Sequence, residues 1–412
     1  GFDSLHPLQF SRTASRLGFR SAVTRTPSPA TDPSPVAGVS RRPPDLLTWW
    51  PDLPVTSTRF DIIVIGAGIS GLTSALALQR SGASVAILDR GQPGTEASWA
   101  GGGILCPLYA WRYPAPVLSM AAEGMRRYPG LLESLDSRID PERVVTGMRI
   151  LDPVDPGEAT AGIATTLGQA GIRHEWQPAD GQPALWLPDI ANVRNPRLLD
   201  ALVDTVSVRG IRLFAQRAVQ TIHTRSGRVA GVGTSEGTLA ADRVVVAAGA
   251  WSEALIPDMR RNSLFPVRGQ MLRLEPRAEN RLDHILMDQG VYLIPRADDS
   301  VVIGSTVEHA GFDKTVDDRT QSRLHATACR LWPPLAGARV THRWAGLRPG
   351  SSDELPVLGE HPTIEGLWVN TGGFRNGLAM APATADLLTE MMTGRPALLD
   401  PSPYRVERLI GA

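Results

Sequence analysis

Residues 61–89, DIIVIGAGISGLTSALALQRSGASVAILD, decide the fold of this chain. An apolar run, Ile62 to Ile65, predicts a buried parallel strand. A glycine-rich turn follows, then a stretch of good helix formers that Gly82 ends, and then a second apolar run, Val85 to Leu88. The order of strand, turn, helix and strand predicts a βαβ unit.

The turn has the spacing G-x-G-x-x-G, formed by Gly66, Gly68 and Gly71. In a dinucleotide-binding unit these glycines make the tight turn, let backbone approach a pyrophosphate, and let the helix pack closely on the strand. The motif alone also fits an ordinary turn. Here Asp89 ends the second strand, where its carboxylate can accept hydrogen bonds from a ribose and repel a 2′-phosphate. The sequence therefore predicts binding of FAD or NAD rather than NADP.

Three further segments favour FAD, because protein must hold a flavin along its whole length. They are EASWAGGGILCP at 96–107, RVVVAAGAWS at 243–252 and TGGFRNGLAMAPATADLL at 371–388. The first offers three glycines that let backbone lie against a flat ring, and the last opens a late helix. Each segment alone is also typical of a tight turn or a core strand.

Together, in this order and spacing, these segments resemble the D-amino acid oxidase family of flavoproteins, and within it the glycine oxidases of thiamine biosynthesis. The resemblance extends from Phe60 to about Arg408 and is closest in ASWAGGGIL, GVYLIPR, WAGLRPGSSDELPVLG and GGFRNGLAMAPAT. It implies an α/β fold in which a Rossmann-like FAD-binding domain is interleaved with a substrate domain built on an antiparallel sheet.

The two domains are expected to alternate along the chain. We assign residues 59–138, 190–262 and 338–409 to the FAD-binding domain, and 139–189 and 263–337 to the substrate-binding domain. The second insertion contains GQMLRLEP and VYLIPRADDSVVIGSTV, whose alternation and β-branched residues predict strands. We expect these strands to cover the flavin.

Residues 1–58 are rich in Ser, Thr, Pro and Arg and lack hydrophobic periodicity, which predicts a disordered extension. Arg41 and Arg42 superficially resemble a twin-arginine signal, but no apolar region follows them, so export is not expected. The arginines among serines also permit an organellar transit peptide, which nearby aspartates disfavour. The missing initiator Met permits an over-extended or truncated reading frame.

The composition predicts an ordinary cytoplasmic enzyme with no nucleic-acid partner and no membrane span. The 412 residues carry a formal net charge of zero and 42% hydrophobic residues, enough for two packed domains. The two cysteines, Cys106 and Cys329, and eight histidines without ligand spacing predict neither a disulfide framework nor a metal site. The single lysine, Lys314, lies in a polar loop with no other sign of a site.

The resemblance assigns substrate chemistry to three residues. Arg348, in WAGLRPG, matches the arginine that binds the substrate carboxylate, and its planar fork suits a bidentate contact. Tyr292, in GVYLIPR, matches the tyrosine partner, and Arg375, in GGFRNG, matches a second arginine facing substrate and flavin. An arginine is usually a solvated ion-pair member, but both of these lie in glycine-rich, otherwise apolar segments, which favours a function.

The expected cofactor contacts come from the glycine-rich segments and their surroundings. The late helix, beginning near Leu378, is expected to direct its N-terminal dipole at the flavin ring. The cofactor-binding residues that we expect are Gly66, Gly68, Ile69, Ser70, Gly71, Asp89, Arg90, Ala97, Ser98, Gly102, Gly103, Ile104, Val219, Ala248, Gly249, Gly373, Phe374, Arg375, Asn376, Gly377 and Leu378.

The resemblance implies oxidative deamination of glycine, and of small amines or D-amino acids, by hydride transfer to non-covalent FAD. The expected products are glyoxylate, ammonia and hydrogen peroxide, with O2 as the acceptor and a homo-oligomer as the assembly. A sarcosine oxidase-like enzyme is the nearest rival, but its flavin-linking cysteine and oxygen-activating lysine have no counterpart at a matching place. A D-amino acid dehydrogenase, a non-catalytic FAD-binding module and an NAD-dependent dehydrogenase also stay open.

Overall fold

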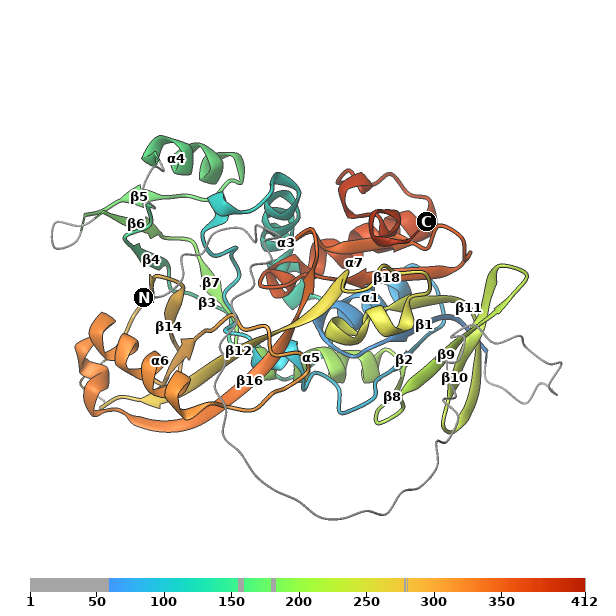
Figure 1. Ribbon diagram of the computed structural model, residues 1–412, viewed down its shortest axis with the longest axis horizontal. Helices are drawn as coiled ribbons and strands as arrows, with labels where there is room; N and C mark the ends of the chain where they lie inside the picture. The colour runs from blue at the N-terminus through green and yellow to red at the C-terminus, as the bar shows by residue number, and fades with distance from the viewer. Residues whose placement is uncertain (1–58, 155–158, 179–182, 278, 280, 412) are drawn as a thin grey trace, which may run out of the picture. The chain divides into compact units, whose positions relative to one another are not determined.

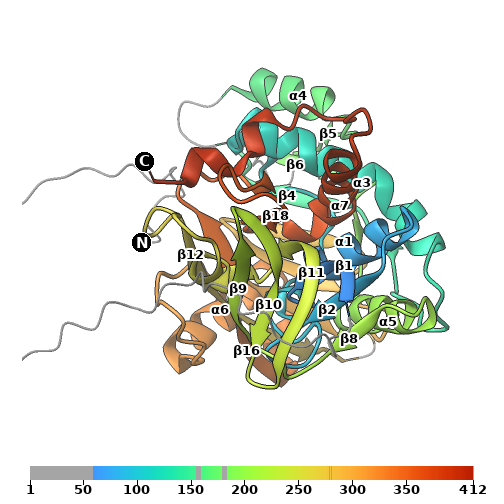
Figure 2. The ribbon, with the colours of Figure 1, turned by 90° about the vertical axis from the view of Figure 1, so that its right-hand side faces the viewer.

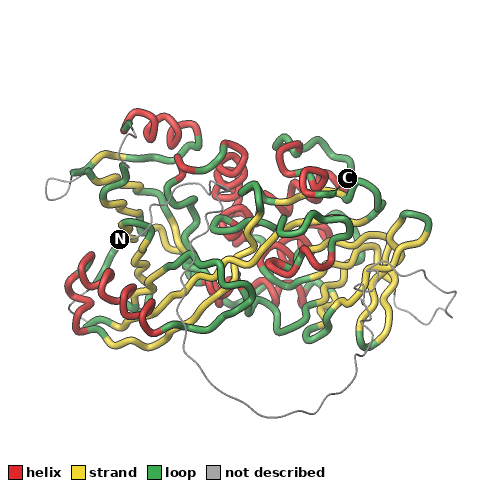
Figure 3. The backbone as a smooth tube through the Cα atoms, viewed as in Figure 1, coloured by secondary structure: helices red, strands yellow, loops and turns green. Residues whose placement is uncertain are grey.

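The computed structural model describes most of the chain after the N-terminal extension. The described residues are 59–411, without 155–158, 179–182, 278 and 280. The predicted disordered extension, 1–58, thus lies outside the described residues. All described residues fall in one compact unit, in which the strands gather into two large sheets (Figures 1 and 3). Within this described part, no helix is long and apolar enough to cross a membrane.

The first sheet contains the predicted βαβ unit. Its main path runs β17-β18-β11-β1-β2-β8, and β1 pairs in parallel with both β2 and β11. Two further strands extend this sheet: β10 pairs antiparallel with β11, and β9 pairs antiparallel with β10 (Figure 2). The strands are β1 (Arg59–Ile65), β2 (Val85–Leu88), β8 (Arg212–Phe214), β9 (Val219–Arg225), β10 (Arg228–Thr234), β11 (Gly237–Val246), β17 (Val357–Glu360) and β18 (Leu367–Thr371).

Helix α1 (Ile69–Arg80) joins β1 to β2 and confirms the predicted crossover. Its apolar side chains, Leu72 and Leu76 among them, are buried in a core shared with β1 and β2, and each such burial contributes about 1.5 to 3 kcal/mol. Gly82 has φ +97°, a conformation that suits glycine and ends the helix as predicted. The other helices of this sheet are α3 (Ala115–Glu133), α5 (Asn195–Val208) and α7 (Gly377–Thr393).

The second sheet is mostly antiparallel, as predicted, and runs β16-β12-β15-β14-β13-β4-β6-β5. Helix α6 (Asp318–Leu331) packs against it and is capped by Asp317, whose side chain accepts hydrogen bonds from the backbone N–H groups of Arg319 and Thr320. The strands are β4 (Met148–Leu151), β5 (Glu175–Trp176), β6 (Ala184–Leu187), β12 (Leu264–Glu275), β13 (Ile285–Asp288), β14 (Val291–Pro295), β15 (Val301–Gly304) and β16 (Arg339–Ser351).

Short elements complete the described chain. A two-stranded sheet pairs β3 (Val144–Val145) with β7 (Ala191–Asn192). The remaining helices are α2 (Ala97–Ala100), α4 (Thr160–Gln169) and the 3-10 turns η1 (Ala110–Arg112), η2 (Gly249–Trp251), η3 (Glu253–Leu255), η4 (Pro333–Gly337), η5 (Ser402–Tyr404) and η6 (Val406–Leu409).

Strand β16 belongs to the second sheet, although it follows the domain boundary predicted at residue 338. The sequence assignment placed residues 338–409 in the FAD-binding domain, whereas β16 pairs with β12 along its whole length and belongs to the second sheet. The first sheet resumes only at β17. The reason is that cross-strand pairing over a long antiparallel ladder, which a local pattern does not show, fixes the sheet to which a strand belongs.

Candidate active site

One cavity, of about 380 Å³, is bordered by both sheets. The three predicted substrate residues, Arg348, Tyr292 and Arg375, line it. So do all the predicted cofactor residues except Gly71 and Asn376. The structure therefore brings together residues that are up to about 300 positions apart in the sequence around one hollow, Gly66 and Arg375 among them.

The glycine-rich turn has the geometry that a pyrophosphate needs. Gly66 has φ +105°, and a Cβ there would collide with the backbone of Ala247. A Cβ at Gly71 would collide with the Gly66 carbonyl, so Gly71 faces the turn rather than the cavity. Gly68 precedes α1 and has no side chain to cap it, and the first turn holds no acidic residue. The Ile69 N–H donates to Ser98 Oγ at 2.9 Å. The positive end of α1 thus faces the cavity with N–H groups that suit a phosphate.

Asp89 lies at the end of β2, on the cavity wall. Its two carboxylate oxygens accept hydrogen bonds from the backbone N–H of Ala67, at 2.7 Å, and of Gly91, also at 2.7 Å. These bonds fix the carboxylate where a ribose is expected. Beside it the Arg90 guanidinium stacks over the Trp251 ring, 3.4 Å from its centroid, and both residues line the cavity. The predicted cofactor residues did not include Trp251, although it lies in the segment 243–252 that supplied Ala248 and Gly249.

The loop around Gly102 lies against the second sheet. A Cβ at Gly102 would meet Ile294 Cδ1 at 2.7 Å and Tyr292 Cε2 at 3.0 Å, so a larger residue would force these side chains to shift. Arg296, at the end of GVYLIPR, donates hydrogen bonds to the Gly102 carbonyl at 2.8 Å and to the Val193 carbonyl at 2.9 Å. Loss of solvation lowers the pKa of Arg296 to about 10, so it stays charged at neutral pH. The sequence-based prediction missed this anchoring role.

Arg348 and Tyr292, which the sequence predicted to bind the substrate, both line the cavity. Arg348 Nη1 donates to the Thr306 carbonyl at 3.1 Å, and Nη2 donates to Ser305 Oγ at 2.6 Å. Loss of solvation lowers the pKa of the guanidinium, an effect that the neighbouring Tyr292 opposes and the charge of Arg375 reinforces. Thr306 and Ser305 thus each occupy a donor on one of the two terminal nitrogens, and Tyr292 lies beside the guanidinium. The remaining donors can bind an anion.

The start of α7 forms another part of the cavity wall. Gly377 and Leu378 line the cavity, and α7 begins without a side-chain cap or an acidic residue in its first turn. Asn376 stays outside the lining because it is buried as the residue before the helix, where its backbone carbonyl accepts from the Met380 N–H at 2.9 Å. This helix end can stabilise negative charge on a bound ring.

Cys106 is a buried thiol, and Lys314 is a member of an ion pair. Cys106 lines the cavity, and burial raises the pKa of its thiol to about 12, so the reactive thiolate is absent at neutral pH. Lys314 Nζ lies 3.0 Å from Glu96 Oε2 in an ion pair. Among the residues that the structure describes, no three His, Cys, Asp or Glu side chains lie where they could hold a metal ion.

The protonated state of Cys106 yields a prediction about the cofactor. Denaturing the purified yellow protein and filtering it is expected to release intact FAD, because a thiol without its charge does not attack a flavin. The flavin in the filtrate is measured by absorbance and chromatography. Cys106→Ser is expected to keep the same flavin content. Flavin that stays with the denatured chain would show a covalent link.

Comparison with known proteins agrees with this geometry. Residues 61–391 match the family DAO, described as FAD dependent oxidoreductase. The chain is 41% identical over 355 residues to a glycine oxidase of Pseudomonas aeruginosa, a match that covers 83% of this chain and 97% of that protein. It is 33% identical to the bifunctional protein ThiO/ThiG of a Synechocystis species, covering 81% of this chain and 52% of that protein.

A solved structure shows the same fold. The crystal structure of glycine oxidase from Geobacillus kaustophilus matches with a TM-score of 0.78 and 27% identity, covering 86% of this chain and all of that one. The glycine-rich turn, the start of α1 without an acidic residue and the shared cavity define a flavin-binding enzyme. The chain belongs to the DAO family of FAD-dependent oxidoreductases.

Proposed function

We propose that this chain oxidises glycine to glyoxylate and ammonia, using FAD held without a covalent bond. The observation that carries the proposal is the position of Arg348 and Tyr292 on the same cavity as the glycine turn at Gly102. The relatives from Pseudomonas aeruginosa and Pseudomonas putida, 41% and 40% identical, bear the name glycine oxidase, which supports the same substrate.

The side chains of the cavity can bind and orient an amino acid. The free donors of Arg348 suit the substrate carboxylate, and the Tyr292 hydroxyl adds a neutral hydrogen bond. FAD, when bound, accepts a hydride from Cα. With the carboxylate fixed on one wall and one Cα hydrogen facing the flavin, only one face of Cα can carry a side chain. Glycine has hydrogen on both faces and always fits. For substrates with a side chain, the resemblance to the D-amino acid oxidase family favours the D-isomer.

The proposal includes a place in thiamine biosynthesis and a cellular setting. The relatives named bifunctional protein ThiO/ThiG, from Synechocystis and Trichormus variabilis, support a role in synthesis of the thiamine thiazole. We further propose O2 as the electron acceptor, with hydrogen peroxide as product, and a homo-oligomeric enzyme of the cytoplasm.

A second candidate is a D-amino acid dehydrogenase. The chain is 27% identical to a protein of that name from Cereibacter sphaeroides, and the match covers 85% of this chain and 95% of that protein. Such an enzyme would pass electrons to another acceptor than O2, so its reaction would release no peroxide.

Peroxide release across a panel of amino acids tests the proposal. We expect turnover of glycine, slower turnover of sarcosine, D-alanine and D-proline, and none of L-alanine or L-proline, because a side chain on the wrong face of Cα clashes with the orientation that Arg348 imposes. Peroxide is measured with a coupled peroxidase. Strong turnover of an L-amino acid would contradict the geometry. Flavin reduction by D-amino acids without peroxide would favour the dehydrogenase.

A further inference from the structure

The side chain of Arg348 crosses a neighbouring strand before it meets its partners. The strand order is β16-β12-β15, and Arg348 on β16 pairs with Val267 on β12. Its guanidinium lies against Gly269, where a Cβ would collide with it, and its partners Ser305 and Thr306 follow β15 on the far side of β12. Because Gly269 has no side chain, the Arg348 side chain has room to cross β12 at this position.

The segment that receives the guanidinium is bound to β12 by backbone hydrogen bonds. Arg268 N donates to the Glu308 carbonyl at 2.8 Å, and Glu308 N donates to the Arg268 carbonyl at 2.9 Å. Gln270 N donates to Thr306 Oγ1 at 2.9 Å. Residues 305–308 thus continue the sheet beyond the end of β15, and their position depends on β12.

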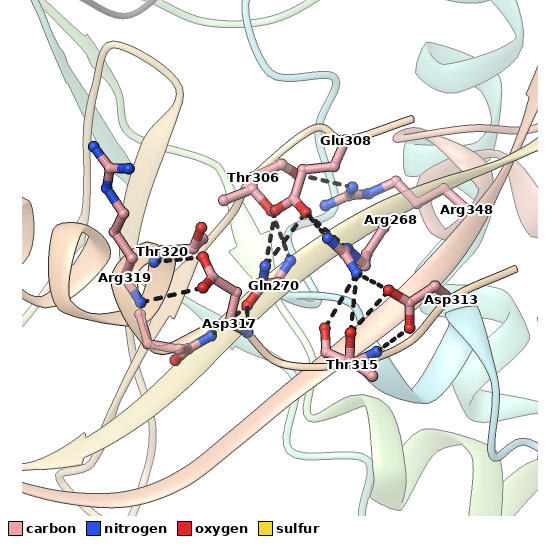
Figure 4. A network of polar contacts seen from close by, with 11 residues as sticks. Arg268, Gln270, Thr306, Glu308, Asp313, Thr315, Asp317, Arg319, Thr320 and Arg348 are labelled. Carbon is pink, nitrogen blue, oxygen red and sulfur yellow. Dashed lines mark hydrogen bonds and ion pairs between the residues drawn. The ribbon is translucent and has the colours of Figure 1, made fainter. Parts of the chain in front are cut away.

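Side-chain hydrogen bonds outside the cavity also fix the position of residues 305–308 (Figure 4). The Glu308 carboxylate accepts from Arg268 Nε at 2.7 Å and from Gln270 Nε2 at 3.0 Å. Arg268 Nη1 also donates to Asp313 at 2.7 Å. The Arg268 side chain is only 13% exposed and Gln270 is fully buried, so water competes weakly for these bonds. Arg268, Gln270 and Glu308 all lie outside the cavity lining.

We infer that Glu308 is a positioning residue for carboxylate recognition, acting through Thr306 and Ser305 on Arg348. The inference rests on the proposed function, in which Arg348 binds the substrate carboxylate. Ser305 and Thr306 occupy donors on both terminal nitrogens and so fix the plane of the guanidinium. The other N–H donors of Arg348 then face the cavity in one orientation. Substrate binding therefore does not have to bear the entropy cost of fixing this side chain.

Two substitutions test the inference in the FAD-loaded enzyme. Ser305→Ala removes one hydrogen bond to Arg348, and Glu308→Gln removes the charge that holds Arg268 while keeping the shape. Each is expected to raise the KM for glycine by about 3- to 10-fold, the effect of one hydrogen bond, and to leave kcat within about 2-fold. The dissociation constant of acetate, a carboxylate that cannot react, is measured from the flavin absorbance and should rise by the same factor.

Glu275→Gln is the matched control. Glu275 also lies on β12 and pairs with Arg339, and its 37% side-chain exposure places that ion pair at the surface. This variant is expected to keep the KM for glycine and the acetate affinity of the parent protein. The FAD dissociation constant, measured by flavin fluorescence on the apoprotein, is expected to stay within about 2-fold in all three variants.

The outcomes separate this inference from the proposed function. If Arg348→Lys weakens acetate binding but Ser305→Ala and Glu308→Gln do not, the inference is wrong and the carboxylate site stands. If Arg348→Lys also leaves acetate binding unchanged, the proposed carboxylate site is wrong. A loss of FAD affinity and kcat in Glu308→Gln that matches the rise in KM would show a structural role and overturn the inference.

Discussion

Arg348→Ala is expected to raise the KM for glycine by about 30- to 5000-fold while the enzyme keeps its FAD. Removing one partner of a desolvated charge pair costs about 2 to 5 kcal/mol, because the carboxylate then lies in the cavity without its cation. The residues expected to contact FAD are others that line the cavity, such as the glycine turn at Gly66 and the start of α7. Steady-state kinetics and the flavin-to-protein ratio measure the two effects separately.

Arg343→Ala provides a matched control on the same strand. Arg343 pairs with Asp318 at 3.0 Å, but the two side chains are 47% and 92% exposed, so this surface ion pair contributes little. We expect the KM for glycine to stay unchanged in this variant. Equal kinetics in Arg348→Ala and the parent protein would place carboxylate binding elsewhere.

Gly66→Ala is expected to destabilise the folded chain by about 2 to 6 kcal/mol and to abolish FAD binding. The sum combines about 1 to 3 kcal/mol for an alanine at positive φ with about 1 to 3 kcal/mol for a forced contact in a packed site. The new methyl group would press on the backbone of Ala247, at the end of the neighbouring strand. Denaturant unfolding and the flavin content of the purified protein report the two losses.

Gly82→Ala separates strain from collision. Gly82 has φ +97°, close to that of Gly66, but a Cβ there meets nothing within 4 Å. This variant is expected to lose only the conformational part, about 1 to 3 kcal/mol, and to bind FAD normally. If both variants lose the same stability and both retain flavin, the close approach of Gly66 to Ala247 carries no cost.

The βαβ unit could be predicted from sequence because all its signals are local. The apolar run of β1, the helix formers of α1 and the glycine at 82 each act on their own neighbours, and the structure places them as expected. The three substrate residues were placed by resemblance, and the structure gathers Arg348, Tyr292 and Arg375 around one cavity, while their roles stay predictions.

The parts that sequence did not reveal depend on distant pairing. Ser305 and Arg296 make hydrogen bonds to partners that are 43 and 194 positions away, and no local pattern distinguishes them from ordinary strand-end residues. The position of β16 in the second sheet has the same cause, since β12 is the strand with which it pairs along its whole length. The sequence determines these contacts between distant residues, but they can be recognised only in the folded chain.

The wide sequence span of the cavity lining has a consequence for the timing of cofactor loading during synthesis. The lining begins at Ile65 and extends to Leu378, and the Arg296 side chain must reach back to Gly102 before the loop around that glycine is fixed. A nascent chain that has left the ribosome only as far as the βαβ unit therefore offers FAD one wall of its site. FAD should load only after the ribosome has translated α7. The flavin content of a preparation then counts molecules that have finished folding, not merely those in which the first domain has formed.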